Sequence, residues 1–221
     1  MKRPFTVGGL FSGIGGIELG FMRSGFEVLW SNEIDKAASK TFLKNFKHNH
    51  ILKDICDLNG GDLEPVDILV GGFPCQAFSL AGYRKGFADE RGNLFFEIIR
   101  LVKELKVRPK ILFLENVKNF LTHDNGNTYQ RVYDLLKETG YCSIFTDVLN
   151  TKDITSIPQN RERTFIIAFD EDSEARLQPE TKSYIFNQLF PPKHINNIDH
   201  IKKFLEKGRV GNEYYYGPEK Y

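Results

Sequence analysis

Cysteine is scarce in this 221-residue chain, and its arrangement limits the class of protein. The three cysteines, Cys56, Cys75 and Cys142, are odd in number and far apart in the sequence. This argues against a disulfide framework and favours a reducing compartment. There is no CxxC pair, and the neighbouring His48 and His50 match no metal-ligand spacing. We therefore predict that the protein binds no metal and that both histidines lie at the surface.

Long apolar runs, an N-terminal signal sequence, internal repeats and low-complexity segments are lacking too. No apolar run is long enough to cross a bilayer, so the sequence predicts a cytoplasmic protein without a membrane partner. A strong charge of one sign is also lacking, because the formal net charge is +1. A complete nucleic-acid-binding protein is usually more basic, so such a role would depend on a local patch or a further segment.

The chain does contain an alternation of short β-branched stretches with amphipathic ones, and 41% of its residues are hydrophobic. This pattern predicts an α/β fold with a mostly parallel sheet and helices on both faces. The predicted strands cover residues 6–11, 26–31, 51–55, 66–70, 110–117, 142–149 and 164–169. The predicted helices cover residues 17–22, 36–46, 93–106, 128–140 and 195–207.

The stretch GGFPCQ at residues 71–76 directly follows the predicted strand 66–70. Its glycines allow a tight exit from the strand, and Pro74 fixes one backbone dihedral beside Cys75. A thiol at the carboxyl end of a strand lies where open α/β sheets bind their ligands. The alternative is that Cys75 is a small buried hydrophobe without a chemical role, which is what we expect of Cys142.

A glycine-rich turn, FSGIGG at residues 11–16, joins the first predicted strand to the first helix. Such glycines let the backbone approach a ligand at a helix N-terminus, and Glu33 follows at a spacing suited to bonding ribose hydroxyls. Without a Walker lysine the turn suits an adenosine that lacks a phosphate chain, with Phe11 able to stack on the purine. Asp54 is placed to accept a hydrogen bond from an adenine amino group. The competing interpretations are an ordinary tight turn for the glycines and a helix cap for Asp54.

Charged side chains gather in three later segments. Residues 78–92 form a long, basic connection, which indicates either a binding loop or a solvated surface loop. Glu115 ends a predicted buried strand and should emerge at the same sheet edge as Cys75. Arg161 and Arg163 are two residues apart before a strand and therefore share a face. Surface charge is the ordinary interpretation of such an arginine pair.

Four of these motifs stand in the order and spacing of one family: FSGIGG at 11–16, GFPCQ at 72–76, ENV at 115–117 and QNRER at 159–163. Over residues 5–169 the chain resembles the C5-cytosine DNA methyltransferases, S-adenosylmethionine enzymes mostly of bacterial restriction–modification systems. The resemblance implies a Rossmann-like fold and methylation of a cytosine flipped out of duplex DNA. The alternatives are a tRNA cytosine-5 methyltransferase and an inactive fragment that only binds the cofactor or a partner.

The resemblance implies a catalytic role for Cys75, Glu115, Arg161 and Arg163. Cys75 would add to C6 of the base and make C5 nucleophilic. Glu115 would bond N3 and the exocyclic amine, Arg163 would hold O2, and Arg161 would support the site. The loop 78–92 would close over the flipped base. Its implied DNA-binding residues are Ser79, Arg84, Lys85 and Arg91.

The family's cofactor pattern also maps onto this chain. The implied S-adenosylmethionine-binding residues are Phe11, Gly13, Gly15, Gly16, Glu33, Ile34, Asp54, Ile55, Pro74 and Leu94. Two positions depart from the pattern, because many members have Asp or Ser where Gly9 stands and Trp is frequent where Ile34 stands. These departures concern the details of the cofactor pocket.

The resemblance ends near residue 169. Family members continue into a target-recognition domain and then a returning segment that completes the cofactor pocket. We expect a catalytic domain at residues 1–185 and a linker toward an absent recognition domain at 186–221, which leaves the fold incomplete at the C-terminus. The missing segment would come from a longer native chain or from a second subunit. We therefore expect the chain alone to bind the cofactor weakly and not to methylate DNA specifically.

Overall fold

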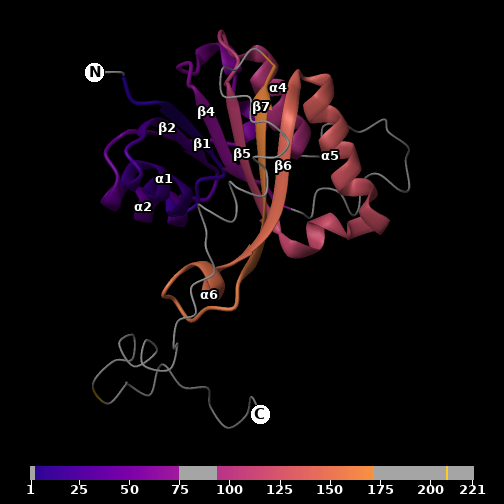
Figure 1. Cartoon of the computed structure of the whole chain (residues 1–221). Helices are drawn as coiled ribbons and strands as arrows, with labels where there is room; N and C mark the ends of the chain where they lie inside the picture. The colour runs from indigo at the N-terminus through magenta and orange to yellow at the C-terminus, as the bar shows by residue number, and fades with distance from the viewer. Residues whose placement is uncertain (1–2, 75–93, 172–207, 209–221) are drawn as a thin grey trace, which may run out of the picture.

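The computed structural model describes residues 3–74, 94–171 and 208, and the strands of these residues form one seven-stranded sheet (Figure 1). The order across the sheet is β3-β2-β1-β4-β5-β7-β6. The strands are β1 (Thr6–Leu10), β2 (Glu27–Glu33), β3 (Asn49–Leu52), β4 (Ile68–Gly72), β5 (Ile111–Val117), β6 (Tyr141–Asn150) and β7 (Glu162–Asp170). The predicted α/β fold with a mostly parallel sheet is confirmed.

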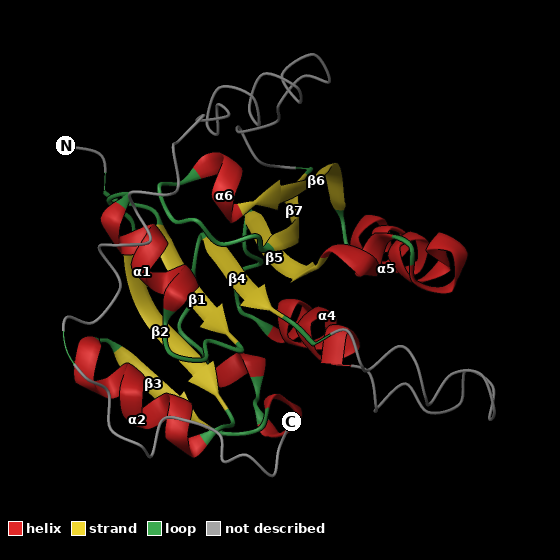
Figure 2. Ribbon diagram, turned by 90° about the horizontal axis from the view of Figure 1, so that it is seen from below, coloured by secondary structure: helices red, strands yellow, loops and turns green. Residues whose placement is uncertain are grey.

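Strand direction decides which side chains meet. The strands from β3 to β5 pair in parallel, whereas β7 runs antiparallel to β5 and β6. The carboxyl ends of the parallel strands and the start of β7 therefore lie at one edge of the sheet, here called the carboxyl edge (Figure 2). The opposite edge is called the amino edge. The register pairs Gly72 with Glu115 and Val117 with Arg163, both at the carboxyl edge.

Helices follow the strands in the crossovers that parallel pairing requires. They are α1 (Gly16–Arg23), α2 (Lys36–Asn45), α4 (Leu94–Glu104), α5 (Asn127–Glu138) and the short α6 (Thr151–Ile154). Short 3₁₀ turns cover Ile55–Asp57, Gly60–Asp62, Lys118–Leu121 and His123–Gly126. The last helix, α6, lies at the tip of the β6–β7 hairpin, away from the body of the sheet (Figure 1).

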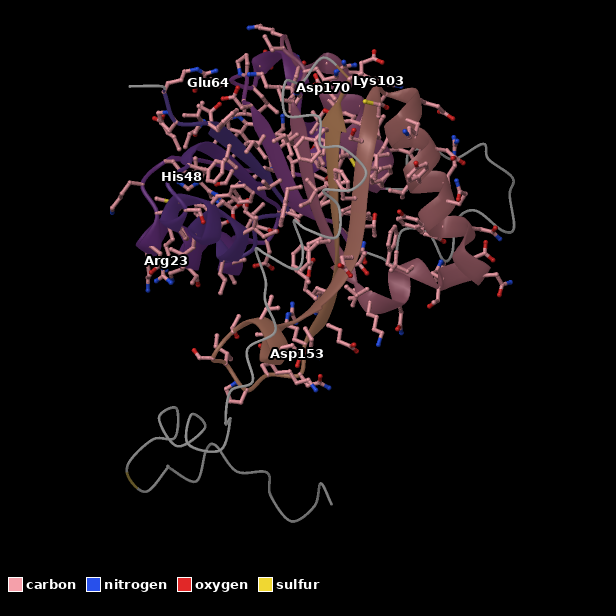
Figure 3. All side chains as sticks on the ribbon, viewed as in Figure 1. Arg23, His48, Glu64, Lys103, Asp153 and Asp170 are labelled. Atoms are coloured by element: carbon pink, nitrogen blue, oxygen red, sulfur yellow. The ribbon has the colours of Figure 1, made fainter. Side chains whose placement is uncertain are left out.

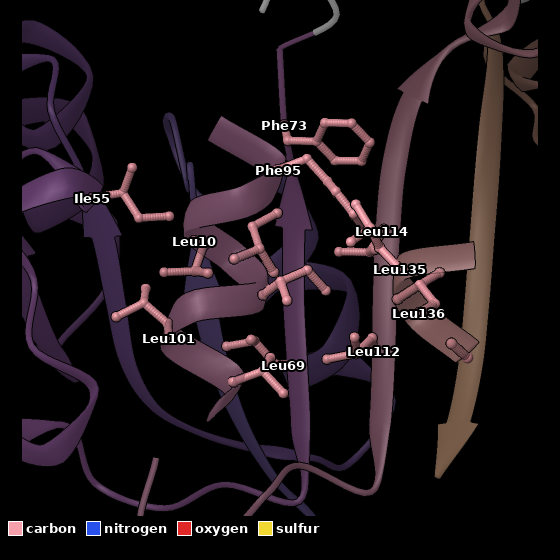
Figure 4. Packing of buried hydrophobic residues seen from close by; sticks show 14 of the residues in the cluster. Leu10, Ile55, Leu69, Phe73, Phe95, Leu101, Leu112, Leu114, Leu135 and Leu136 are labelled. Carbon is pink, nitrogen blue, oxygen red and sulfur yellow. The ribbon is translucent and has the colours of Figure 1, made fainter. Parts of the chain in front are cut away.

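The core has two layers because alternate residues of a strand point to opposite faces of the sheet. Leu69 of β4 and Leu112 of β5 are buried in the larger cluster, which includes the apolar faces of α4 and α5 (Figure 4). Ile68 and Val70, the neighbours of Leu69 in β4, belong to a smaller cluster on the other face, against which α1 packs. Helices thus cover both faces, as the sequence pattern predicted.

The single tryptophan of the chain shows why β1 carries glycine. Trp30 of β2 is 1% exposed, and its indole Nε1 donates a hydrogen bond of 2.8 Å to the carbonyl of Glu64. A Cβ atom on Gly8 would lie 2.3 Å from the Trp30 ring. Gly8 therefore leaves the space that the indole fills.

Several sequence predictions need correction. His48 and His50 are half-buried rather than at the surface, because the His50 ring stacks on Phe42 and bonds the hydroxyls of Ser31 and Ser39. The His48 ring packs edge-on against Phe42 of α2, and Figure 3 labels its position.

Two further corrections concern segments near cysteines. Cys142 is half-buried on the outermost strand β6 rather than a core residue, since an edge strand has a neighbour on one side only. The predicted strand 51–55 lies instead at Asn49–Leu52, and a 3₁₀ turn begins at Ile55. The predicted helix 195–207 and the linker 186–221 lie outside the described residues, except for Gly208.

Candidate active site

The glycine-rich turn 11–16 links β1 to α1 at the carboxyl edge. Phe11, Gly13 and Gly15 adopt positive φ angles of 54°, 55° and 95°. Gly15 caps α1, and a Cβ atom there would lie 2.2 Å from the Phe46 ring, so both its dihedral and its packing require glycine. Gly16 is the first residue of α1. The turn therefore presents backbone at a helix N-terminus, as the sequence predicted.

Glu33 ends β2 beside this turn and fixes its shape. Its Oε2 accepts a hydrogen bond of 2.7 Å from the Gly13 amide. Its Oε1 accepts bonds from the amides of Ile34 at 2.8 Å and Asp35 at 2.9 Å. A carboxylate has about four lone-pair sites, so these three bonds leave room for about one further donor. Ile34 is 59% exposed next to it and offers an uncovered apolar surface.

Asp54 and Ile55 follow the end of β3, and their side chains differ in surroundings. Asp54 Oδ1 accepts a hydrogen bond of 2.9 Å from the Cys56 amide, so the cap interpretation describes the geometry of this side chain. The Ile55 side chain is 3% exposed and belongs to the core. Any contact of Ile55 with a ligand would therefore use its backbone.

Two polar residues that the sequence analysis missed hold this region in place. The buried Asn32 donates from Nδ2 to the carbonyls of Ile51 at 3.0 Å and Lys53 at 2.7 Å. Arg100 of α4 donates to the carbonyls of Ile55 and Leu58, both at 2.9 Å. These long-range contacts have no signature in the local sequence.

Glu115 and Arg163 meet at the carboxyl edge although 48 positions separate them in the sequence. Arg163 Nε lies 2.8 Å from Glu115 Oε1, and both side chains are about one-fifth exposed. A Cβ atom on Gly72 would lie 3.1 Å from Glu115 Oε2, so glycine leaves space beside the carboxylate. The structure thus brings together two of the predicted catalytic residues, on β5 and β7, beside the end of β4, the strand that precedes Cys75.

The environment of Glu115 favours its protonated form. Burial raises the pKa of Glu115 above its ordinary value, and the positive charges of Arg163 and Arg161 oppose this shift without reversing it. A carboxyl group with a raised pKa is suited to donate a proton in a reaction near neutral pH.

Asn116 joins the two central strand ends. It is 2% exposed, and its Nδ2 donates a hydrogen bond of 3.0 Å to the carbonyl of Phe73. This bond fixes the exit of β4 relative to β5, immediately before Pro74, which is exposed. Cys75 lies outside the described residues. The same holds for the predicted loop residues Ser79, Arg84, Lys85 and Arg91.

An open cleft of about 340 Å³ adjoins the ion pair. It is lined by residues 117–119 and 159–163, which include the exposed Arg161. The Arg161 amide donates to Asn150 Oδ1 at 3.1 Å, and Lys118 forms an exposed ion pair with Glu162. The backbone of the arginine motif is therefore held by hydrogen bonds next to an open cleft.

Other features of the described residues complete the description of the site. Leu94 is half-buried at the start of α4 and packs against the core. Among residues 3–74 and 94–171 no group of three or more metal-ligating side chains is found. In the same part of the chain no helix is long and apolar enough to span a membrane.

A glycine-rich turn after β1 and an acid at the end of β2, on a largely parallel sheet, place the chain among the Rossmann-like α/β folds. The chain belongs to the C-5 cytosine-specific DNA methylases, because the model of this family matches residues 5–221. It is 51% identical over 165 residues to the Type II methyltransferase M.Bsp6I of Bacillus sp. (strain RFL6), covering 74% of this chain and 51% of that protein. It is 47% identical over 194 residues to the Type II methyltransferase M.HhaI of Haemophilus parahaemolyticus, covering 86% and 58%.

Solved structures agree on the fold. S. pombe Dnmt2 methyltransferase superimposes with a TM-score of 0.75 at 20% identity, over 97% of this chain and 65% of that one. A putative DNA modification methyltransferase encoded within an E. coli prophage gives a TM-score of 0.65 at 29% identity, over 87% and 52%. The chain spans about half the length of the curated relatives that it matches.

Proposed function

We propose that this chain is the catalytic part of a DNA cytosine-5 methyltransferase of a bacterial restriction–modification system. The observation that carries the proposal is the Glu115–Arg163 pair of 2.8 Å at the carboxyl edge. Glu115 of β5 pairs there with Gly72, three residues before Cys75 in the sequence. The Type II methyltransferases among its relatives support double-stranded DNA as the substrate and the bacterial cytoplasm as its location.

The residues divide the chemistry between them. The Cys75 thiolate adds to C6 of cytosine while the Glu115 carboxyl donates a proton to N3, so that no negative charge accumulates on the ring. The C5 carbon then carries the electron pair that attacks a methyl group. After methylation, loss of the C5 proton and elimination of the thiolate restore the aromatic ring. Arg163, which forms an ion pair with Glu115, would hold the base O2.

The residues at the first two strand ends fit S-adenosylmethionine. The remaining acceptor site of Glu33 suits a ribose hydroxyl, and the exposed Ile34 suits the face of an adenine ring. Asp54 and the backbone of Ile55 lie on the adenine side, and the turn 11–16 faces the methionine side. The cofactor supplies an activated methyl group as a sulfonium when it is bound.

The relatives are about twice as long as the part of them that matches this chain. We propose that sequence-specific DNA binding and the rest of the cofactor pocket come from the segment corresponding to their other half, in one chain or in a second subunit. Base-edge contacts specify sequence, and the +1 net charge of this chain provides little non-specific affinity for phosphates.

The decisive experiment measures the transfer of labelled methyl groups to DNA and to tRNA by the intact protein. We expect incorporation into duplex DNA, and Cys75→Ser should abolish it while leaving cofactor affinity nearly unchanged. Duplex DNA that contains 5-fluorocytosine should trap a covalent adduct with the wild type only, because the fluorine cannot leave as the proton does. Transfer to tRNA but not to DNA, or an equally stable adduct with Cys75→Ser, would contradict the proposal.

A further inference from the structure

Glu18, in the first turn of α1, is the most unusual charged residue of the described chain. Its side chain is 1% exposed, yet both carboxyl oxygens lack a hydrogen-bond partner among the described residues. A buried carboxyl group without a partner is strongly unfavourable, and native proteins contain few such groups. The sequence analysis attached no function to Glu18, because an acid in the first turn of a helix is commonplace.

The space that Glu18 occupies lies under the glycine-rich turn. A Cβ atom on Gly9 would be 2.2 Å from Glu18 Oε1 and 2.9 Å from Ser12 Oγ. The absence of a side chain on β1 therefore makes the room into which the carboxyl group of α1 reaches. Ser12 Oγ is buried and also lacks a partner among the described residues. The Ser12 hydroxyl and the Glu18 carboxyl group thus share one small space behind the turn 11–16, and neither has a charged partner among the described residues.

The other acid at this turn cannot take the same role. Glu33 has three of its about four acceptor sites filled by the amides of Gly13, Ile34 and Asp35. Glu18 has only the neighbouring Ser12 hydroxyl and its own backbone amide near its carboxyl group, and no lysine or arginine among residues 3–74 and 94–171 forms an ion pair with it. The carboxyl group therefore has no cationic partner among the described residues.

We propose that Glu18, supported by the Ser12 hydroxyl, accepts the ammonium group of the methionine portion of S-adenosylmethionine. The assignment rests on the proposed function, which puts the methionine side of the cofactor at the turn 11–16. An ammonium group donates three hydrogen bonds and carries the charge that a buried carboxylate needs as a partner. Glu33 and Glu18 then have separate roles, with Glu33 on the ribose and Glu18 on the amino acid portion.

The electrostatics of Glu18 agree with this role. Burial raises the pKa of Glu18, the Ser12 hydroxyl and the backbone amide of Glu18 oppose part of this shift, and the negative charge of Glu33 adds to it. Without a cation the carboxyl group therefore tends toward its neutral form. A cationic ligand in contact with it favours the ionised form, so binding and ionisation support each other.

The test compares two ligands that differ at the amino acid portion. S-Adenosylhomocysteine carries the ammonium group, whereas 5′-methylthioadenosine has the same nucleoside and sulfur without it. We expect Glu18→Gln, which keeps the size of the side chain, to weaken S-adenosylhomocysteine binding about 10- to 100-fold, the typical worth of a charged hydrogen bond. Its affinity for 5′-methylthioadenosine should match that of the wild type. Calorimetry on the intact protein provides both constants.

Gly9→Ala is the second variant, because its added methyl group must displace Glu18 Oε1. It should show the same selective loss while keeping the carboxyl group in the chain. Equal weakening of both ligands, or of neither, in both variants would overturn the assignment and indicate a structural role for Glu18. Failure of the wild type to bind either ligand would instead contradict the proposed function.

Discussion

Buried carboxyl groups at the two edges of the sheet differ in their hydrogen-bond and charge partners. At the amino edge the Asp67 side chain, 7% exposed, accepts hydrogen bonds from the Thr6 amide at 3.0 Å, from the Thr6 hydroxyl at 3.1 Å and from Lys110 Nζ at 3.2 Å. At the carboxyl edge Glu18 lacks a partner in the described chain, and Glu115 has Arg163. Figure 3 shows the two ends, with Glu64 and Asp170 near the amino edge and Asp153 at the far tip of the β6–β7 hairpin.

The same contrast appears in the proton affinities. Burial alone would raise the pKa of Asp67, but the hydrogen bonds from Thr6 and Lys110 outweigh it and leave the pKa lowered. Burial raises the pKa of Glu115 and of Glu18. Hydrogen bonds at the amino edge therefore stabilise the ionised form of Asp67, whereas burial at the carboxyl edge disfavours the ionised forms of Glu18 and Glu115.

Of the substitutions that test this difference between the edges, Glu115→Gln should have the largest effect, and the effect should be on the rate of methyl transfer. Gln keeps the shape of the side chain but cannot donate a proton to N3, so methyl transfer should fall about 10²–10⁴-fold, the usual contribution of general acid–base catalysis. The free energy of unfolding should change little, because relief of the buried charge and loss of the ion pair with Arg163 act in opposite directions. Single-turnover kinetics and denaturant titration measure the two quantities. A near-normal rate would remove Glu115 from the mechanism.

Asp67→Asn should have the opposite signature. The amide keeps one acceptor oxygen but loses the charge and part of the bonding to Thr6 and Lys110, so the protein should lose about 1–3 kcal/mol of unfolding free energy. The rate of methyl transfer by the folded fraction should remain close to that of the wild type, since Asp67 lies at the other end of the strands. A large fall in that rate without loss of stability would contradict the division between the edges.

The smallest expected effect is a difference in pH dependence. The pKa of Asp67 is lower in the folded state than in the unfolded state, so its contribution to stability is present above the ordinary aspartate pKa and is lost as the pH falls through the folded value. Unfolding titrations from pH 6 to pH 3 should thus show a steeper loss in the wild type than in Asp67→Asn. Glu115 has the opposite sign, because its raised pKa reduces stability as the pH rises past the unfolded value. Parallel curves for wild type and Asp67→Asn would show that Asp67 does not set the acid limit.

The strands and helices followed closely from hydrophobic periodicity, which is a local property. The predicted strand 66–70 lies at Ile68–Gly72, and the predicted helix 93–106 lies at Leu94–Glu104. The meeting of Glu115 with Arg163 followed only in part, because the sequence places both at strand ends but does not give the antiparallel direction of β7. The catalytic and cofactor roles of the candidate residues remain predictions, which the experiments above address.

Long-range polar contacts were beyond the reach of the sequence. Asn32, Arg100 and Asn116 each bond carbonyls of another segment, and nothing in their neighbouring residues indicates those partners. The burial of Glu18 was hidden for a related reason, since it depends on the empty space above Gly9 rather than on its own position in α1. Features that require two distant segments to be placed together are the ones that periodicity cannot supply.

Trp30 gives the molecule an intrinsic optical reporter. It is the only indole of the chain, it is 1% exposed, and its ring covers Gly8 in the first half of the sheet. In this apolar setting its fluorescence should lie at short wavelength and shift to the red when β1 and β2 separate. Because α5 and the β6–β7 hairpin contain no second tryptophan, emission follows only the half of the sheet that contains β1, β2 and β3. Comparing it with circular dichroism would therefore show whether the two halves of the sheet unfold together.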